Sequence, residues 1–469
     1  MPSTDSMTRI VPTVGRRETL LGKPRSRSLA DGSLWVIVAV VFLCAVLGIA
    51  INTDLNISDN PGSARAASQS VREGNRPYNE TAIGACLVCL LIAATRAEWS
   101  RRALRVLKSP IAWALSYQGI IAWHYLSDGN LWDLARTCGG AVLLVVAMAA
   151  SPLMAIEKYV SRMLLLFRFL LWTSLVVGIL LPNNGWQHSY YQSFIPGIYD
   201  RFSGVGGHAN GMGAIASIAI LLELGQFLAG RTRPWISVLH LGLGSALLLL
   251  TQSKTSLMAC AICVVYLLLS HRGRFLPRLA RGLMVALAVL AGSVVAWSAI
   301  SEWVASNTGS LEEFSGRLSL WRYYLELGLD RPWFGYGTSL WSELLNSVSF
   351  KYQWAAGNAH NQILNSFLMA GVFGVGCLVA YVIGLFRSRR RMDIRYRPIF
   401  TAYLLFMVIR SFAEAGFDPS DLGVGGTIQI VLVGFCLCRP VQRSALYAGG
   451  VYRALRPKRA DLEVQVTQQ

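Results

Sequence analysis

The sequence is poor in charged residues, and poorest in acidic ones. Only 14% of its 469 residues are charged, and 25 Asp and Glu stand against 43 Lys and Arg, so the formal net charge is +18. A soluble domain carries roughly 25% charged residues, and disorder requires low hydrophobicity, whereas 54% of this chain is hydrophobic. The composition therefore excludes a disordered chain and an ordinary soluble domain. A chain this basic usually indicates a nucleic-acid-binding protein. Whether that interpretation applies here depends on where the basic residues lie.

Twelve apolar stretches run through the chain, and most approach the roughly 20 residues that cross a bilayer core. The stretches are continuous rather than alternating, which favours helices over a membrane β-barrel. The sequence thus predicts an all-α, polytopic integral membrane protein with about 12 transmembrane helices. The stretches lie near residues 34–51, 81–95, 110–127, 133–150, 163–181, 207–229, 234–251, 255–270, 283–300, 360–386, 398–413 and 424–438.

The basic residues gather on one side of these predicted helices. With the N-terminus in the cytoplasm, the cytoplasmic segments hold 31 Lys and Arg and 8 acidic residues, and the outer segments hold 9 and 16. The net charge is then about +23 inside and −7 outside, as the positive-inside rule requires. We therefore predict that both termini are cytoplasmic. The basic charge is a topology signal, and no nucleic-acid partner is expected.

The predicted helices divide the chain into five parts. They are a basic cytoplasmic tail (1–33), transmembrane helices 1–9 with outer loops 52–80 and 182–206 (34–300), a large outer loop with two helical patterns that form a small cap (301–359), transmembrane helices 10–12 (360–438) and a second cytoplasmic tail (439–469). None of the nine cysteines lies in an outer loop, so no disulfide framework is expected. The six histidines have no paired ligand spacing, so no metal site is expected.

The outer side is net acidic, so its few basic residues are candidate ligands for an anion. Arg201 precedes a glycine-rich helix start that contains His208 and Asn210, and a helix N-terminus offers free N–H groups to an anion. The alternative is a structural role, because glycines are common where helices begin. Lys254 lies in a short polar break between two apolar stretches. There it either meets a lipid phosphate or extends along the bilayer edge towards water.

Arg317 and Arg322 lie near the start of a helical pattern in the large loop. A spacing of five residues places them roughly 140° apart on a helix, so they need not share a face. Arg322 is the better candidate for a plain surface residue. Arg317 is therefore the stronger candidate of the two for a ligand of an anion.

A candidate base lies where the large loop returns to the membrane. His360 and Asn361 stand at this point, and a neutral histidine can accept a proton near neutral pH. The alternative is a histidine that caps a helix or lies at an interface. Glu414 and Asp418, at another outer helix end, are alternatives for the same role.

The order of these motifs resembles the O-antigen ligase and polysaccharide polymerase superfamily over about residues 200–380. The motifs are R-F-S-G-x-G-G-H-A-N-G-x-G from Arg201, T-Q-S-K-T from Thr251, S-G-R-L-x-L-W from Ser315, R-P-W-F-G-Y-G from Arg331 and A-H-N-Q-I-L-N-x-F-L-x-A-G-V-F-G from Ala359. The family's Ser-Arg in the membrane break is Ser253-Lys254 here. The first 180 residues match only in hydropathy.

The resemblance implies a metal-independent glycosyltransferase that needs no cofactor and no nucleotide sugar. Such an enzyme moves a glycan from an undecaprenyl diphosphate carrier to a sugar hydroxyl, at the periplasmic face of the bacterial inner membrane. The implied catalytic base is His360. The implied ligands of the diphosphate and glycan are Arg201, His208, Asn210, Lys254, Arg317 and Asn361, with Arg322 and Glu414 as further candidates.

Three functions are compatible with these features, besides that of a family relative that O-glycosylates protein. The first is a polymerase that links lipid-linked repeat units into an exopolysaccharide or O-antigen, and the second is a ligase that transfers the polymer to the lipid A core. The third, from another class, is a twelve-helix secondary transporter, which would show paired halves with broken helices. The expected partners of the enzyme are the lipid-linked oligosaccharide, an acceptor glycan and membrane lipid, with a flippase or chain-length regulator as candidate protein partners.

Overall fold

The computed structural model describes residues 109–127, 156–188, 200–270, 317–347 and 358–415, with a few single positions besides. Seven of the twelve apolar stretches lie on its helices, and the other five lie wholly or mostly outside the described residues. The seven helices are α4 (Ile111–Ser127), α6 (Ile156–Leu180), α8 (Ala209–Leu228), α9 (Pro234–Leu250), α10 (Lys254–Ser270), α14 (Gln362–Ser388) and α15 (Arg397–Ser411).

Three of the described helical segments are long and apolar enough to cross a membrane. They are α6, α8 and the stretch Gln362–Arg391, while α9 and α10 are apolar but shorter. The mostly helical fold is therefore confirmed, and the three candidate spans support the prediction of a membrane protein. The number of twelve spans and the cytoplasmic position of both termini stay predictions.

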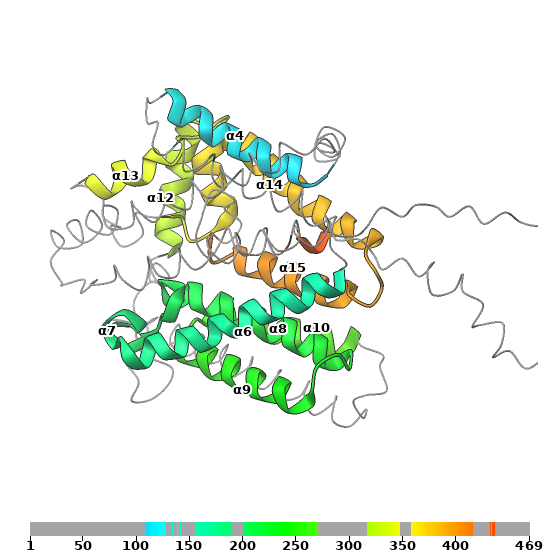
Figure 1. The fold of residues 1–469 in the computed structure, drawn as a ribbon. Helices are drawn as coiled ribbons and strands as arrows, with labels where there is room; N and C mark the ends of the chain where they lie inside the picture. Colours follow the sequence, from blue (N-terminus) through cyan, green and yellow to red (C-terminus); the bar gives the residue numbers. More distant parts are fainter. Residues whose placement is uncertain are drawn as a thin grey trace, which may run out of the picture.

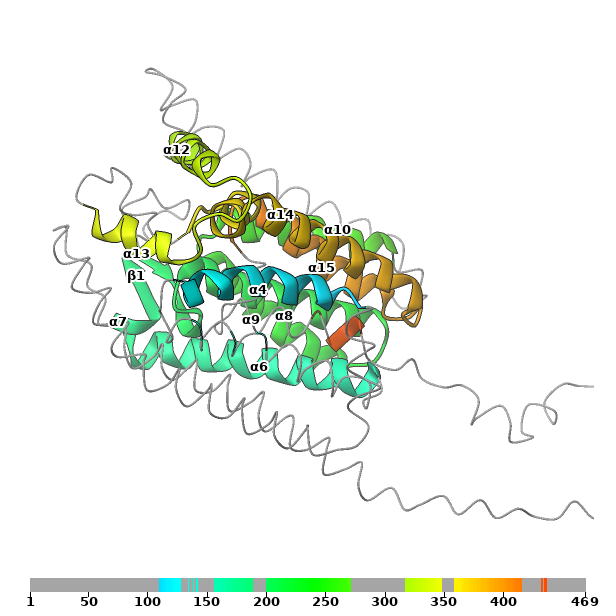
Figure 2. The same ribbon diagram turned by 90° about the horizontal axis from the view of Figure 1, so that it is seen from above.

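Helix α8 lies at the centre of the bundle. It packs against α6, α9, α10 and α15, and nearly all of its side chains are buried. Its apolar residues surround the helix, which is the pattern of a helix enclosed by others. Helix α15 also contacts α14, which packs along α4 (Figure 1). The helix ends therefore gather at two opposite ends of the bundle (Figure 2).

A partly buried ion pair joins α6 to α8. The Arg168 guanidinium donates from Nε and Nη2 to the two carboxylate oxygens of Glu223, at 2.8 and 2.7 Å. The Ser237 hydroxyl of α9 donates a further hydrogen bond of 2.7 Å to Glu223. Charged side chains within apolar helices require such partners, and this pair therefore fixes the register of three helices.

Two local features differ from the sequence-based expectation. Helix α6 begins at Ile156 rather than near residue 163. Its first turns continue the buried face through Ile156, Tyr159 and Val160, while the charged residues between them lie outside that face. A short antiparallel pair, β1 (Trp186–His188) and β2 (Asp200–Phe202), interrupts the all-α architecture. Its aromatic rings Trp186 and Phe202 pack edge to face at 5.2 Å.

The large loop contains two helices, at the positions of the two helical patterns. They are α12 (Arg317–Asp330) and α13 (Ser339–Asn346). The turn between them is hydrogen-bonded into a break in α14, where Gly371 has φ of 63°. Val372 N donates to Pro332 O at 2.8 Å, and Tyr336 N donates to Leu368 O at 2.8 Å. The turn thus satisfies backbone groups that the break in α14 exposes.

Replacing Gly371 with alanine is expected to destabilise the protein by about 1–3 kcal/mol. A positive φ disfavours any L side chain, and a Cβ at this position would overlap the backbone of Trp333. The measurement is the thermal unfolding of the purified variant in detergent. Gly376→Ala is the control, since no atom of the described structure lies within reach of a Cβ there. Equal melting temperatures for the two variants would contradict this account of the break.

Candidate functional site

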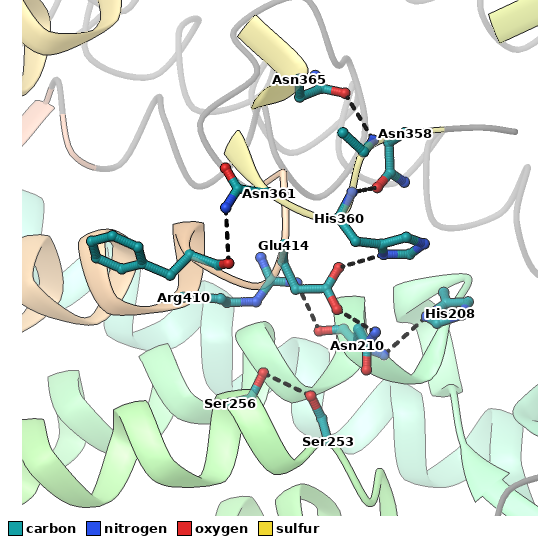
Figure 3. A network of polar contacts seen from close by, with 12 residues as sticks. His208, Asn210, Ser253, Ser256, Asn358, His360, Asn361, Asn365, Arg410 and Glu414 are labelled. Atoms are coloured by element: carbon teal, nitrogen blue, oxygen red, sulfur yellow. Dashed lines mark hydrogen bonds and ion pairs between the residues drawn. The ribbon is translucent and has the colours of Figure 1, made fainter. Parts of the chain in front are cut away.

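Four helix ends meet at the end of the bundle that also carries β1 and β2. They are the N-termini of α8, α10 and α14 and the C-terminus of α15, as the contacts described below establish (Figure 3). Free N–H groups and the helix dipole make a helix N-terminus favourable for anions. Three such termini at one place create a local environment that suits a negatively charged ligand.

His360 and Glu414 face each other at this junction. His360 Nδ1 lies 3.6 Å from Glu414 Oε2, and the side chains are 17% and 10% exposed. Sequence reasoning treated the two residues as alternatives for one role, and the structure brings them together as a pair. A distance of 3.6 Å is longer than a hydrogen bond, but contacts at a catalytic site often tighten only when substrate is bound.

The backbone at His360 is held in an uncommon conformation. Its φ is 48°, in the left-handed region that non-glycine residues seldom occupy. Two asparagines fix the segment: His360 N donates to Asn358 Oδ1 at 2.8 Å, and Ala359 N donates to Asn365 Oδ1 at 3.3 Å. Strain of this kind persists only where the surroundings determine it, and it concentrates at functional sites.

Asn361 and His208 are the N-cap residues of α14 and α8. Asn361 Oδ1 accepts from Leu364 N at 3.1 Å, and its Nδ2 donates to Phe412 O at 3.2 Å. His208 Nδ1 accepts from Asn210 N at 3.1 Å. Both were predicted as ligands of the diphosphate or glycan. In this structure each supports a helix terminus, and Asn361 also joins α14 to the end of α15.

Asn210 connects the pair to Arg201. Its Nδ2 donates to Glu414 Oε1 at 2.6 Å, and its Oδ1 accepts from Arg201 Nη2 at 2.7 Å. Arg201, on β2, also donates from Nε to Thr251 O at 3.0 Å, in the α9–α10 turn. A continuous line of contacts therefore runs from Arg201 through Asn210 and Glu414 to His360.

Arg410 is a site residue for which sequence reasoning gave no role. It is 7% exposed, and its Nη2 donates to Asn210 O at 3.1 Å. Its position within an apolar stretch could have identified it from the sequence, because an ionisable residue inside a membrane helix is a candidate functional residue. With Arg201 and Arg410 against one carboxylate, Glu414, the network carries a net positive charge when the histidines are neutral.

The structure places the remaining predicted residues differently with respect to this network. Lys254 is half-buried and begins α10, directly after the turn that accepts from Arg201. Arg322 is 84% exposed and pairs with Glu326 one turn along α12 at 3.2 Å, so it is a surface residue. Arg317 begins α12, and its side chain lies outside the described residues. The same helix reaches the site at Trp321, whose Nε1 donates to Ala359 O at 2.9 Å.

His208 precedes the α8 span and stays neutral over the ordinary pH range. Desolvation, and then the nearby Arg201 charge, lower the pKa of His208 to about 4, although the residue as a whole is exposed. The neutral ring is needed because Nδ1 accepts the capping hydrogen bond. Because the pKa is depressed in the folded protein, the stability that this cap contributes is fully present above the unfolded pKa of about 6.5. It is lost as the pH falls towards 4.

His208→Asn is expected to remove that pH dependence, since asparagine is an N-cap that does not titrate. His208→Ala is expected to cost about 1 kcal/mol of stability at pH 7. Thermal unfolding of wild type and both variants at pH 7 and pH 5 measures these effects. An identical loss of stability between the two pH values in wild type and His208→Asn would contradict the assigned cap.

Among the described residues, no group of three or more His, Cys, Asp or Glu side chains is placed to hold a metal ion. The polar atoms that converge here are guanidinium, amide, imidazole and one carboxylate. They are suited to binding anionic oxygen atoms and to moving a proton.

Residues 239–379 match the family model described as O-antigen ligase. This match confirms the predicted resemblance to the O-antigen ligase and polymerase superfamily over the part of the chain that contains Lys254, Arg317, His360 and Asn361. Arg201, Asn210 and Glu414 lie outside the matched residues and join the site through the contacts above. No curated protein matches the chain in a sequence search.

Proposed function

We propose that this protein transfers a glycan from an undecaprenyl diphosphate carrier to a sugar hydroxyl, and so polymerises the repeat units of an exopolysaccharide or O-antigen. The observation that carries the proposal is the His360–Glu414 pair, joined through Asn210 to Arg201 in a chain whose residues 239–379 match the O-antigen ligase family. In this proposal His360 is a base that lies beside an environment for an anion. Glycosyl transfer from a lipid diphosphate requires both.

His360 is the proposed general base. Glu414 lies on the Nδ1 side of the ring, so a proton on Nδ1 leaves Nε2 to accept the proton of the acceptor hydroxyl. The carboxylate then stabilises the imidazolium that forms, as the acidic member of a catalytic triad does. The role of Glu414 is therefore to position His360 rather than to act as the base itself.

Arg201, Lys254 and Arg317 are the proposed ligands of the diphosphate. Breaking the glycosyl–phosphate bond leaves negative charge on the carrier, and preorganised cations stabilise that charge. The N-termini of α8, α10 and α14 add the positive ends of their helix dipoles at the same end of the bundle. Lys254 supplies a charge without the forked geometry of the family's arginine.

Arg317→Lys is expected to lower glycan transfer about tenfold or more, because lysine cannot make the paired contacts of a guanidinium to phosphate. The measurement is complementation of a deletion strain, with polymer amount and length as the readout. Arg322→Lys is the matched control, five residues along the same helix and exposed. Full complementation by Arg317→Lys would show that Arg317 makes no bidentate phosphate contact.

A gene deletion followed by glycan analysis separates polymerase from ligase. A polymerase is supported if single lipid-linked repeat units accumulate and polymer is lost. The alternative, transfer of finished polysaccharide to the lipid A core, is favoured by the description of the matched family, and it predicts intact lipid-linked polymer with uncapped lipid A. The family match does not support the transporter alternative.

The proposed setting is the bacterial inner membrane, with the site facing the periplasm and both termini in the cytoplasm. The charge distribution of the sequence supports this orientation, because the site lies on the side that is poor in Lys and Arg.

A cysteine placed at exposed Arg322 is then expected to react with a membrane-impermeant maleimide in intact spheroplasts. The substrates follow from the proposed reaction: a lipid-linked oligosaccharide and an acceptor glycan, with a flippase or chain-length regulator as further partners.

A further inference from the structure

The end of the bundle opposite the candidate site carries a dense group of arginines. Two turns meet there, between α8 and α9 and between α14 and α15 (Figures 1 and 2). We call this group the arginine patch. Its members are Arg231, Arg233, Arg387, Arg389, Arg390 and Arg391, and all six are exposed.

The patch is short of neutralising charge. Among the described residues at this end, the acidic side chains are Glu157 and Asp393, and both contact Arg395, a seventh arginine. Arg395 donates from Nη2 to Asp393 Oδ2 at 2.7 Å and lies 3.2 Å from Glu157 Oε1. These hydrogen bonds from Arg395 lower the pKa of Asp393, so its carboxylate stays ionised and paired. The six patch arginines are left with positive charge that the described acids do not balance.

The two turns are held together and kept in shape. The Arg231 guanidinium lies over the Tyr396 ring, 4.2 Å from its centroid, which joins the α8–α9 turn to the α14–α15 turn. Arg397 donates to Met392 O and Arg390 O, both at 2.9 Å. These contacts fix the backbone of the short helix η5 (Arg389–Arg391), so its three arginines are presented on an ordered turn.

Large apolar side chains lie beside the arginines. Trp235 is 65% exposed and Ile394 is 71% exposed, and Phe386 is also exposed one residue before Arg387. A tryptophan at a helix end is typical of the boundary between lipid and water. Charged groups next to exposed apolar groups match the two halves of a phospholipid.

We propose that the arginine patch binds the headgroup of an anionic phospholipid, with Trp235, Ile394 and Phe386 against its acyl chains. Arginine makes forked hydrogen bonds to phosphate oxygens, and clusters of 4–8 basic residues next to a membrane helix bind anionic lipids. This site is separate from the candidate glycosyl-transfer site and does not depend on the proposed function. Its role is to select the lipids that surround the inner end of the bundle.

The test is lipid retention by the full-length protein, purified in detergent with equal amounts of phosphatidylglycerol and phosphatidylcholine and measured by native mass spectrometry. Wild type is expected to retain phosphatidylglycerol over phosphatidylcholine by about tenfold or more, given the attraction of each basic residue for an anionic lipid. The triple variant R389Q/R390Q/R391Q is expected to lose most of this preference. R389K/R390K/R391K keeps the charge and is expected to retain more of it than the glutamine variant.

Arg322→Gln is the control, because this exposed arginine lies on α12, away from the patch, and pairs with Glu326. It is expected to keep the wild-type preference. Equal retention of the two lipids by wild type would overturn the proposal, and this comparison needs no variant to fold. Displacement of phosphatidylglycerol by millimolar inorganic phosphate would also overturn it, since the site would then bind free phosphate rather than lipid. An unchanged preference in the folded glutamine variant would overturn the proposal, because η5 supplies three of the six patch arginines.

Discussion

His360→Ala is expected to stop glycan transfer while leaving the protein folded in the membrane. A general base contributes about 10²–10⁴-fold to a rate, and alanine leaves no group that can accept the proton of the acceptor hydroxyl. The structure adds that His360 is fixed by Asn358 and faces Glu414, so alanine also removes the imidazole that Glu414 faces. The measurement is polymer formation in a deletion strain, with membrane abundance followed by immunoblot.

His240→Ala is the matched control for this prediction. His240 lies on α9 and contacts Trp172 and the Ile236 carbonyl, which are not part of the site. We expect it to support polymer of normal length. Normal polymer in the His360→Ala strain would contradict the assignment of the base, and equal loss in both variants would indicate a general effect on folding.

Glu414→Gln is expected to slow transfer about tenfold to a hundredfold. It removes the charge that stabilises the imidazolium, and a hydrogen bond to a charged group is worth about 1.5–3 kcal/mol, where each 1.4 kcal/mol is a factor of ten. Because Glu414 acts through His360, we expect kcat to fall while the KM for the lipid-linked donor changes little. Steady-state kinetics of the reconstituted protein measure this split.

Two comparisons test whether Glu414 acts through His360. Glu326→Gln, an exposed carboxylate paired only with Arg322 in the described structure, is expected to keep wild-type kinetics. The double variant His360→Ala, Glu414→Gln is expected to be no slower than His360→Ala alone, because the two residues act as a unit. A double variant much slower than His360→Ala alone would show that Glu414 acts independently of His360.

The helices could be predicted from hydropathy, and the candidate residues from their position at helix ends. Continuous apolar runs gave α4, α8, α9 and α15 to within a few residues. His360 and Glu414 were both recognised because each stands where an apolar run meets a polar segment. Their contact could not be predicted, since 54 residues separate them in sequence and only the packing of α14 against α15 brings the two helix ends together.

Other features depend on contacts that a single sequence does not contain. Arg410 is recognisable as a charge in an apolar run, but its contact with Asn210 requires α15 to lie against α8. The break at Gly371 needs the turn that contains Pro332 and Tyr336 to be in place. His208 and Asn361 were predicted as ligands because their neighbours suggested an anion site, and this stays a prediction; the structure adds that both cap helices.

The central claim is that this site transfers glycan from a lipid diphosphate. The most direct measurement uses purified protein in lipid nanodiscs with a lipid-linked oligosaccharide, and mass spectrometry of both glycan and carrier. We predict products that grow by whole repeat units, one carrier diphosphate released for each linkage formed, and loss of both in His360→Ala. Transfer by His360→Ala at the wild-type rate, or growth of the glycan without release of carrier diphosphate, would contradict the account.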